Sequence, residues 1–348
     1  MGKRIVSLVA KIALCVGVVE GFVPGGLAAP APGAEDRAAA ELAKEVGTRG
    51  WIVFSAQGPQ GDWDLWLMRP DGSMRKNLTG TAELNEAAAR FSPDGRKMLY
   101  YRMPRAAAVD NNTYGTHELV VARADGSEPV ALGKGWWWAA WGPDSRTLAV
   151  LSKREVQVLD LATRQVLRSL PRQGIVQQLG WSADGKWFCG TANGLGEVWA
   201  IGRMDARTGR LNAVSDTDCY NCTPDWFPDS RQIVYSKGLP RTEGWAQLWM
   251  AGGDGSRRRM LYGEIGRHVY GGATSPDGKY VLLTRSQQDL GRVDNSQTTM
   301  ALVRLADTPI VGGSSAILRK QYPQAKAGPV LDLGPGWEPH WSDAALVR

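Results

Sequence analysis

The chain has 348 residues, of which 43% are hydrophobic and 22% charged, a composition typical of a folded globular protein rather than a disordered one. Its formal net charge is +6. Basic charge this weak and dispersed excludes an electrostatic argument for nucleic-acid binding. No apolar run of about 18 residues follows the first 28, so a polytopic membrane protein is excluded and no span is expected in the mature chain. The sequence holds 15 Trp but only 5 Phe, which suggests that Trp is required at particular positions.

The first 28 residues have the layout of a secretory signal peptide. Lys3 and Arg4 precede a mostly apolar stretch, and small residues at 26 and 28 suit cleavage after Ala28. An uncleaved anchor is the alternative, because Lys11 interrupts the apolar stretch. We therefore predict that the mature chain is exported.

Residues 29–50 are predicted to be a linker with a short helix. A Pro-rich start is followed by an Ala/Glu/Lys-rich stretch, Ala34 to Val46, which Gly47 ends. No segment with helical periodicity stands out after it.

The rest of the chain is organised by a repeated phrase: an aromatic residue, a small residue, Pro, Asp, Gly or Ser, a basic residue and then an apolar strand. Pro presets the turn, Asp binds its backbone and Gly tolerates positive φ, so each phrase predicts a hairpin turn leading into a strand. The first position of the six copies is occupied by Phe91, Trp141, Trp181, Trp226, Thr274 and Trp341.

A second phrase alternates with the first. It is a short strand that ends in an Asp-Gly-like turn, as in the segments 64–72, 118–126 and 247–255, with looser copies elsewhere. Two hairpin turns in each period of roughly 45 residues correspond to the four-stranded blade of a propeller. The predicted fold is therefore all-β, a six-bladed β-propeller spanning residues 51–348.

The order of the phrases also predicts how the ring closes. The chain starts with the second phrase and ends with the first, so N-terminal strands must complete the C-terminal blade. The second strand of that blade is either Trp51 to Ser55 or Ala344 to Arg348, and the sequence leaves both open.

These phrases resemble the TolB-like propeller repeat over nearly all of residues 51–348. The resemblance implies the propeller half of the periplasmic TolB protein, which binds protein partners. The N-terminal α/β domain of TolB has no counterpart here, because only about twenty residues separate the leader from the first blade.

Cys219 and Cys222 form a CxxC motif ahead of Trp226. A zinc site needs a second pair, attached haem needs His where Thr223 stands, and redox motifs lie at helix starts, of which none is predicted here. In an exported protein we expect a local disulfide, with two packed free thiols as the alternative. No metal and no cofactor are expected.

Candidate binding residues lie where the chain enters the innermost strand of a blade, because such segments ring one mouth of the channel. Aromatic side chains at a channel mouth suit stacking on peptides or glycans, although packing between blades explains many single Trp residues. The predicted partner-binding residues are Trp136, Trp137, Trp138, Tyr220, His268, Tyr270, Trp337 and His340.

We predict an exported, non-catalytic propeller, a monomer, that binds a protein or peptide partner of the cell envelope at one mouth of its channel. The alternative is a polysaccharide-directed enzyme, lyase-like, with a metal site built around His268 and His340. No Gly-x-Ser-x-Gly elbow is present to indicate a serine hydrolase, and no catalytic residue is predicted.

Overall fold

A computed structural model describes residues 33–238, 245–287, 295–312, 315–326, 328–344 and 346. The predicted signal peptide and the start of the predicted linker lie outside these residues. Within them, no helix is long and apolar enough to span a membrane.

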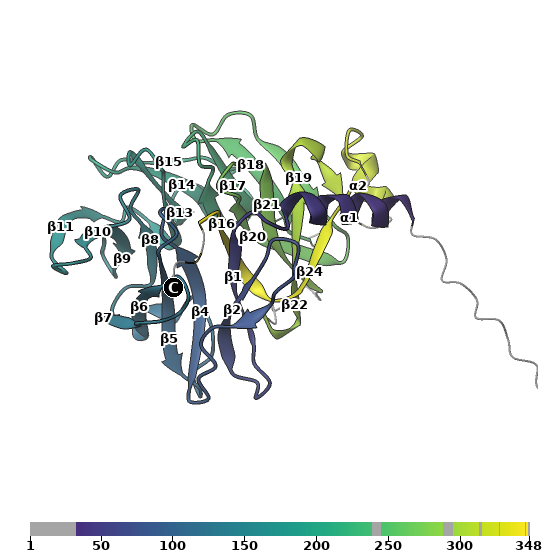
Figure 1. Ribbon diagram of the computed structural model, residues 1–348. Coiled ribbons are helices and arrows are strands. Elements are labelled where there is room, and N and C mark those ends of the chain that lie inside the picture. Colours follow the sequence, from purple (N-terminus) through teal and green to yellow (C-terminus); the bar gives the residue numbers. More distant parts are fainter. Residues whose placement is uncertain are drawn as a thin grey trace, which may run out of the picture.

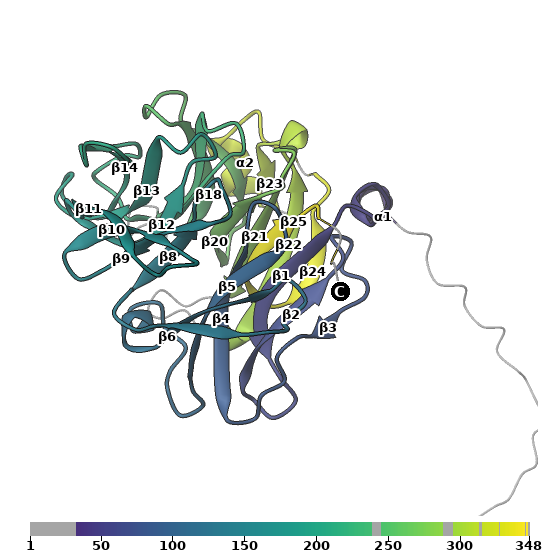
Figure 2. The same cartoon turned by 60° about the vertical axis from the view of Figure 1, so that its left-hand side comes forward.

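Six antiparallel sheets stand around a common axis, which confirms the predicted six-bladed propeller (Figures 1 and 2). Each sheet is given from its innermost strand outward. Blade A holds β25 (Trp337–Ser342), β1 (Trp51–Gln57), β2 (Trp63–Met68) and β3 (Lys76–Asn77). Blade B holds β4 (Leu84–Phe91), β5 (Lys97–Pro104), β6 (Glu118–Arg123) and β7 (Val130–Gly133). Blade C holds β8 (Trp138–Trp141), β9 (Thr147–Leu151), β10 (Glu155–Asp160) and β11 (Val166–Pro171).

The other three blades follow the same order. Blade D holds β12 (Ile175–Trp181), β13 (Trp187–Ala192), β14 (Ala200–Asp205) and β15 (Leu211–Ala213). Blade E holds β16 (Asn221–Trp226), β17 (Gln232–Lys237), β18 (Gln247–Gly252) and β19 (Arg259–Gly263), with β23 (Ile310–Val311) added in parallel at its outer edge. Blade F holds β20 (Arg267–Thr274), β21 (Tyr280–Gln287), β22 (Thr298–Arg304) and β24 (Leu331–Pro335).

Blade A closes the ring. Its innermost strand, β25, comes from the C-terminal end and pairs antiparallel with β1, with Ile52 opposite Trp341. The strand beside β25 is therefore the N-terminal one, which resolves the two possibilities that the sequence left open. Neighbouring innermost strands contact one another around the whole ring, so the sheets share one continuous channel wall.

The repeated turns form as their sequence predicts. Asp94 Oδ1 accepts hydrogen bonds from the Ser92 hydroxyl at 2.6 Å and from the Arg96 amide at 3.1 Å, and Asp184 does the same in blade D. Gly95 has a φ of +67°, where a side chain is strained.

Two turns hold Ser in place of this Gly, although Ser rarely adopts positive φ. Ser145 and Ser230 have φ of 56° and 59°. Their hydroxyls accept hydrogen bonds from the backbone amides of Asp94 (3.0 Å) and Asp184 (2.9 Å), each in the preceding blade. A hydrogen bond between blades thus compensates for the backbone strain that Ser introduces.

Five of the six turns start with an aromatic residue, and blade F has Thr274 there. Trp141, Trp226 and Trp341 are buried, and the Trp341 indole N–H donates to the Arg49 carbonyl at 2.6 Å. Burying a side chain of this size contributes about 2–3 kcal/mol, so the ring of Trp residues is a substantial part of the core. Packing between blades thus explains part of the excess of Trp in the sequence.

Helix α1 (Ala34–Val46) occupies the segment where a short helix is predicted, and it lies against the propeller beside β24 (Figure 1). Leu42 and Val46 have no exposed surface and join the core of blades A and F. A second helix, α2 (Ala316–Gln321), and three short 3₁₀ segments (Tyr114–Thr116, Asn295–Gln297 and Leu305–Asp307) lie in the connections.

Five of the six innermost strands are interrupted by a bulge at the same repeat position. The residue three before the turn aromatic has positive φ in five blades, with Ala88, Gln178, Thr223, Gly271 and Glu338 at this position. The pairing register shifts at the same point, whereas β8 pairs with β9 without a shift. Bulges redirect side chains, and these do so around the channel.

Candidate functional site

A cavity of about 610 Å³, here called the channel pocket, lies at the mouth where the innermost strands begin. Its walls come from all six innermost strands and from the loops that join the second and third strands of blades B, D, E and F. A cavity of this size can hold a small ligand or several side chains of a partner.

Aromatic rings form much of the wall. Trp138 is buried and its ring stacks on Tyr114 with centroids 6.0 Å apart, while Tyr114 stacks on Tyr101 at 4.6 Å. Trp337 meets Trp63 edge to face at 5.9 Å. These contacts hold Trp138 and Trp337 rigidly, so each presents a fixed surface to the cavity.

Charged side chains also line the pocket. Glu338 and Asp225 line it with Arg90, whose Nη1 donates to the carbonyls of Ala89 (2.9 Å) and Glu338 (3.3 Å). Burial raises the pKa of Glu338 to about 7 and that of Asp225 to about 6, and the positive charge of Arg90 only partly offsets this.

Two buried acceptors in the pocket have no hydrogen-bond partner among the described residues. They are Oε2 of Glu338, whose side chain is 5% exposed, and Oε1 of Gln177, which is 7% exposed. Buried polar atoms are nearly always hydrogen-bonded, so these two require an explanation.

The bulges hold the pocket wall together through a belt of hydrogen bonds between blades. The Thr223 amide donates to Oε1 of Gln178 at 2.7 Å, and the Gly271 amide donates to Oγ1 of Thr223 at 3.0 Å. On the other side of the ring, the Ala88 amide donates to Oγ of Ser55 at 3.2 Å. These three bulges are thus bound by the blade before them, which makes this part of the wall a preformed surface.

Four of the eight predicted binding residues line the channel pocket. Trp138 and Trp337 are described above. Tyr270 donates its hydroxyl to Oδ1 of Asn295 at 3.3 Å. His268 also lines the pocket, where its Nδ1 accepts from the Ala246 amide at 3.0 Å and burial lowers its pKa.

The other four lie elsewhere. The Trp136 indole is directed toward Gln157 between the outer strands of blades B and C, and Trp137 packs on Gly115. Tyr220 is 59% exposed and meets Trp199 edge to face, outside the pocket lining. His340 accepts from the Phe91 amide at 3.3 Å deeper in the channel, and burial, followed by the charge of Arg90, lowers its pKa to about 3.

The structure has no bond between the sulfur atoms of Cys219 and Cys222, and the disulfide of the oxidised protein stays a prediction. Cys222 lies within β16 and faces the channel pocket, whereas Cys219 precedes the strand, with its Sγ 4.0 Å from Oδ1 of Asn221. Burial raises the pKa of both thiols, that of Cys222 to about 11, so neither is a reactive thiolate at neutral pH.

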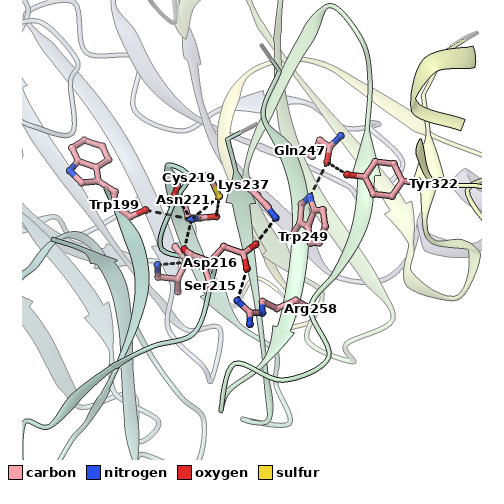
Figure 3. Close-up of polar contacts among 11 residues, drawn as sticks. Trp199, Ser215, Asp216, Cys219, Asn221, Lys237, Gln247, Trp249, Arg258 and Tyr322 are labelled. Carbon is pink, nitrogen blue, oxygen red and sulfur yellow. Dashed lines mark hydrogen bonds and ion pairs between the residues drawn. The ribbon is translucent and has the colours of Figure 1, made fainter. Parts of the chain in front are cut away.

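Cys219 belongs to an inter-blade network that lies beside the pocket (Figure 3). Asp216 forms ion pairs with Lys237 at 2.5 Å and Arg258 at 2.6 Å, and Asn221 donates to the Asp216 carbonyl at 2.9 Å. The Lys237 ammonium lies 4.2 Å from the centre of the Trp249 ring. This network joins blades D and E and explains the position of Cys219 structurally.

In the described ranges, no three His, Cys, Asp or Glu side chains are grouped so that they could hold a metal ion. Nδ1 of His268 and Nδ1 of His340 each accept a backbone amide, as given above. The metal centre of the alternative prediction therefore has no set of ligands in this part of the chain.

The charged residues of the pocket were not among the predicted binding residues. Arg90 and Asp225 stand one residue before the first position of a repeated turn, and Glu338 stands three before it. One residue before the turn position, three other copies of the repeat hold Ala140, Gly180 and Ala273, so the charged residues Arg90 and Asp225 depart from the common pattern there. Trp199, which precedes β14, also lines the pocket.

The chain folds into a closed six-bladed propeller with a cavity at one mouth of its channel. No protein-family model and no curated protein matches the chain. Among solved structures, TolB from Acinetobacter baumannii superimposes with a TM-score of 0.57 and 16% identity, covering 85% of this chain and 67% of that one. A chain of a nidogen/laminin complex gives 0.54 and 12%, covering 74% and 89%.

An oligogalacturonate lyase from Vibrio parahaemolyticus gives a TM-score of 0.45 with 14% identity, covering 74% of this chain and 71% of that one. At such identities the likeness concerns the fold alone. The propeller is thus TolB-like, as the repeated phrases predict.

Proposed function

We propose that the protein is an exported, non-catalytic, monomeric propeller that binds a protein or peptide partner of the cell envelope at the channel pocket. The observation that carries the proposal is the pocket itself: four of the eight predicted binding residues line it, on a wall that neighbouring blades hold in place. Export rests on the signal-peptide layout of residues 1–28.

The shape and lining of the pocket suit a side chain or a short segment of a partner. Rigid aromatic rings in a concave, partly desolvated site are typical of binding hot spots, and they lose little conformational entropy on binding. The surrounding loops offer a polar rim to the rest of the partner, as in other interfaces.

The experiment is capture of partners from the native cell envelope, with identification of the captured proteins. Trp199 and Tyr270 are half-buried and line the pocket, so the double variant Trp199→Ala/Tyr270→Ala removes two rings without emptying the core. We expect the partner to bind this variant at least about 30-fold more weakly, because truncating a hot-spot residue costs about 2 kcal/mol or more.

The matched control is Trp187→Ala. Trp187 is also a half-buried Trp of blade D, but it lies outside the pocket lining, where the Arg203 guanidinium stacks on it. The control should retain the partner. Capture of the same protein by the double variant and by the wild type would contradict the proposal. Turnover of an acidic polysaccharide that is lost in His268→Ala would instead support the enzymatic alternative.

A further inference from the structure

The channel pocket is acidic, although the whole chain is basic. The chain carries a formal charge of +6, whereas the described pocket residues include three carboxyl groups, those of Asp110, Asp225 and Glu338, and a single guanidinium, that of Arg90. Charges of one sign in a concave, low-dielectric site concentrate their field toward the opening. The pocket thus selects for positive charge.

The unpartnered atoms of the pocket are acceptors. Oε2 of Glu338 and Oε1 of Gln177 are buried without a donor among the described residues. Arg90 does not satisfy them, because its Nη1 donates to the backbone carbonyls of Ala89 and Glu338. A ligand that fills the pocket must therefore bring N–H or O–H donors.

The aromatic wall favours the same chemistry. Arg90 already lies over the Trp138 ring, with its guanidinium carbon 5.8 Å from the ring centre, and Tyr270 and Trp337 add further rings around the same cavity. Aromatic faces attract cations, and the attraction is stronger in sites that exclude water.

We propose that the channel pocket takes a positively charged N–H donor group of the partner, seated among Glu338, Asp225 and Gln177 and enclosed by the rings of Trp138, Tyr270 and Trp337. The group is a lysine or arginine side chain or a chain amino terminus. This inference rests on the proposed function and adds to it the chemistry of the bound group.

The two carboxyl groups make such binding dependent on pH. With pKa values of about 7 for Glu338 and about 6 for Asp225, both gain negative charge as the pH rises through this range. Affinity for a cation therefore increases from pH 5 to pH 8. Other titratable or charged groups that line the pocket or act on Glu338 are Arg90, Asp110, His268, Tyr101 and Tyr114.

The test uses the full-length mature protein and capped alanine–lysine–alanine as the probe, with affinity measured by calorimetry or by NMR titration. The same peptide with its lysine side chain acetylated is the neutral comparison. We expect the charged peptide to bind at least about tenfold more tightly at pH 8, as charge-assisted hydrogen bonds are roughly twice as strong as neutral ones. Capped alanine–arginine–alanine and uncapped trialanine amide then separate the three sources of the cation.

Glu338→Gln and its control identify the acceptor. Glu338→Gln keeps the shape of the side chain and should remove both the preference for the charged peptide and its rise with pH. Glu86→Gln is the control, because Glu86 is also a buried glutamate, 1% exposed, with an unpartnered Oε2 and a pKa of about 7, but it does not line the pocket. Glu86→Gln should bind as the wild type does.

Equal affinity for the charged and acetylated peptides in the wild type would overturn the inference, and this comparison does not depend on how any variant folds. So would a full charge preference in Glu338→Gln. If the inference fails while Trp199→Ala/Tyr270→Ala still loses its envelope partner, the proposed function stands and only the chemistry of the bound group is wrong.

Discussion

The two ends of the innermost strands differ in what they do. At the turn end, the blades have near-copies of the same arrangement, with an aromatic ring at the first turn position in five of the six blades and, in most turns, an Asp that accepts backbone amides. At the mouth end, three to five residues earlier in each strand, the blades hold unlike residues, among them Gln177, Tyr270 and Glu338. The similar residues of the turn end hold the blades together, and the unlike residues of the mouth end form the pocket.

The difference follows from what each end must satisfy. Each blade must pack on the next in the same way, so the turn end tolerates little change in volume or hydrogen bonding. The mouth end faces a cavity, where a side chain has few fixed neighbours and can differ from blade to blade. Departures from the repeat are therefore the places to look for function in this propeller.

The largest expected effect is the loss of stability when a residue at the turn end is replaced. Trp341→Ala removes a buried ring that packs on Tyr280 at 5.8 Å and anchors the closing strand through the Arg49 carbonyl. Replacing a buried aromatic residue with Ala costs about 3–5 kcal/mol of unfolding free energy, which urea unfolding would measure. Tyr270→Ala at the mouth end should cost clearly less, because Tyr270 is half-buried. Equal costs at the two ends would contradict the comparison.

The next effect is a gain in stability when a residue at the mouth end is replaced. The pKa of Glu338 is about 7 in the folded protein and 4.5 in an ordinary setting, so the folded state holds a proton that the unfolded state releases. Wild-type stability therefore falls as the pH rises from 4.5 to 7. Glu338→Gln should be more stable than the wild type by about 3 kcal/mol at pH 8.

This gain should be small at pH 4.5, where about half of the unfolded-state carboxyl is protonated, and should disappear about one to two pH units lower, where the wild-type carboxyl is protonated in both states. Thermal or urea unfolding of both proteins across this pH range measures it. A gain that is independent of pH would show that the buried charge is not its cause.

The smallest effect concerns one turn among several. Burial opposes ionisation of Asp94, but hydrogen bonds from Ser92 and the Arg96 amide outweigh it and lower the pKa. Asp94→Ala should cost about 1 kcal/mol at neutral pH, the usual net worth of such a bond. The cost should shrink as the pH falls through the range in which Asp94 is protonated.

The control for this turn is Asp184→Ala, the equivalent change in blade D. If the repeated turns are independent, the two costs should be similar, and the double variant should lose their sum within about 0.5 kcal/mol. A much larger loss in the double variant would mean that the turns act together around the ring.

Sequence periodicity predicted the fold because each blade repeats the same short sequence pattern. The Pro-Asp-Gly turns and the alternation after them are local features, and two turns in each period imply four strands whatever the rest of the chain does. This sequence pattern does not predict the bulges. Gln178 and Glu338 have positive φ although neither residue favours it, because hydrogen bonds and packing from neighbouring blades impose it.

The candidate site was predicted only in part, for the same reason. Tyr270 and Trp337 were found because aromatic residues just ahead of a repeated turn are visible in one blade at a time. Arg90 and Asp225 were not, because their meaning depends on facing the same cavity from different blades. Trp137 does not line the pocket; its ring packs on Gly115, and β8 lacks the bulge that the other innermost strands have.

The sequence by itself thus determined the number of blades, their strand content and the need for N-terminal strands to close the ring. Only the tertiary structure decided which strand pairs with β25 and which side chains share the channel pocket. Turns and strands follow from neighbouring residues in the chain, whereas a pocket on the axis is made by residues that only ring closure brings together.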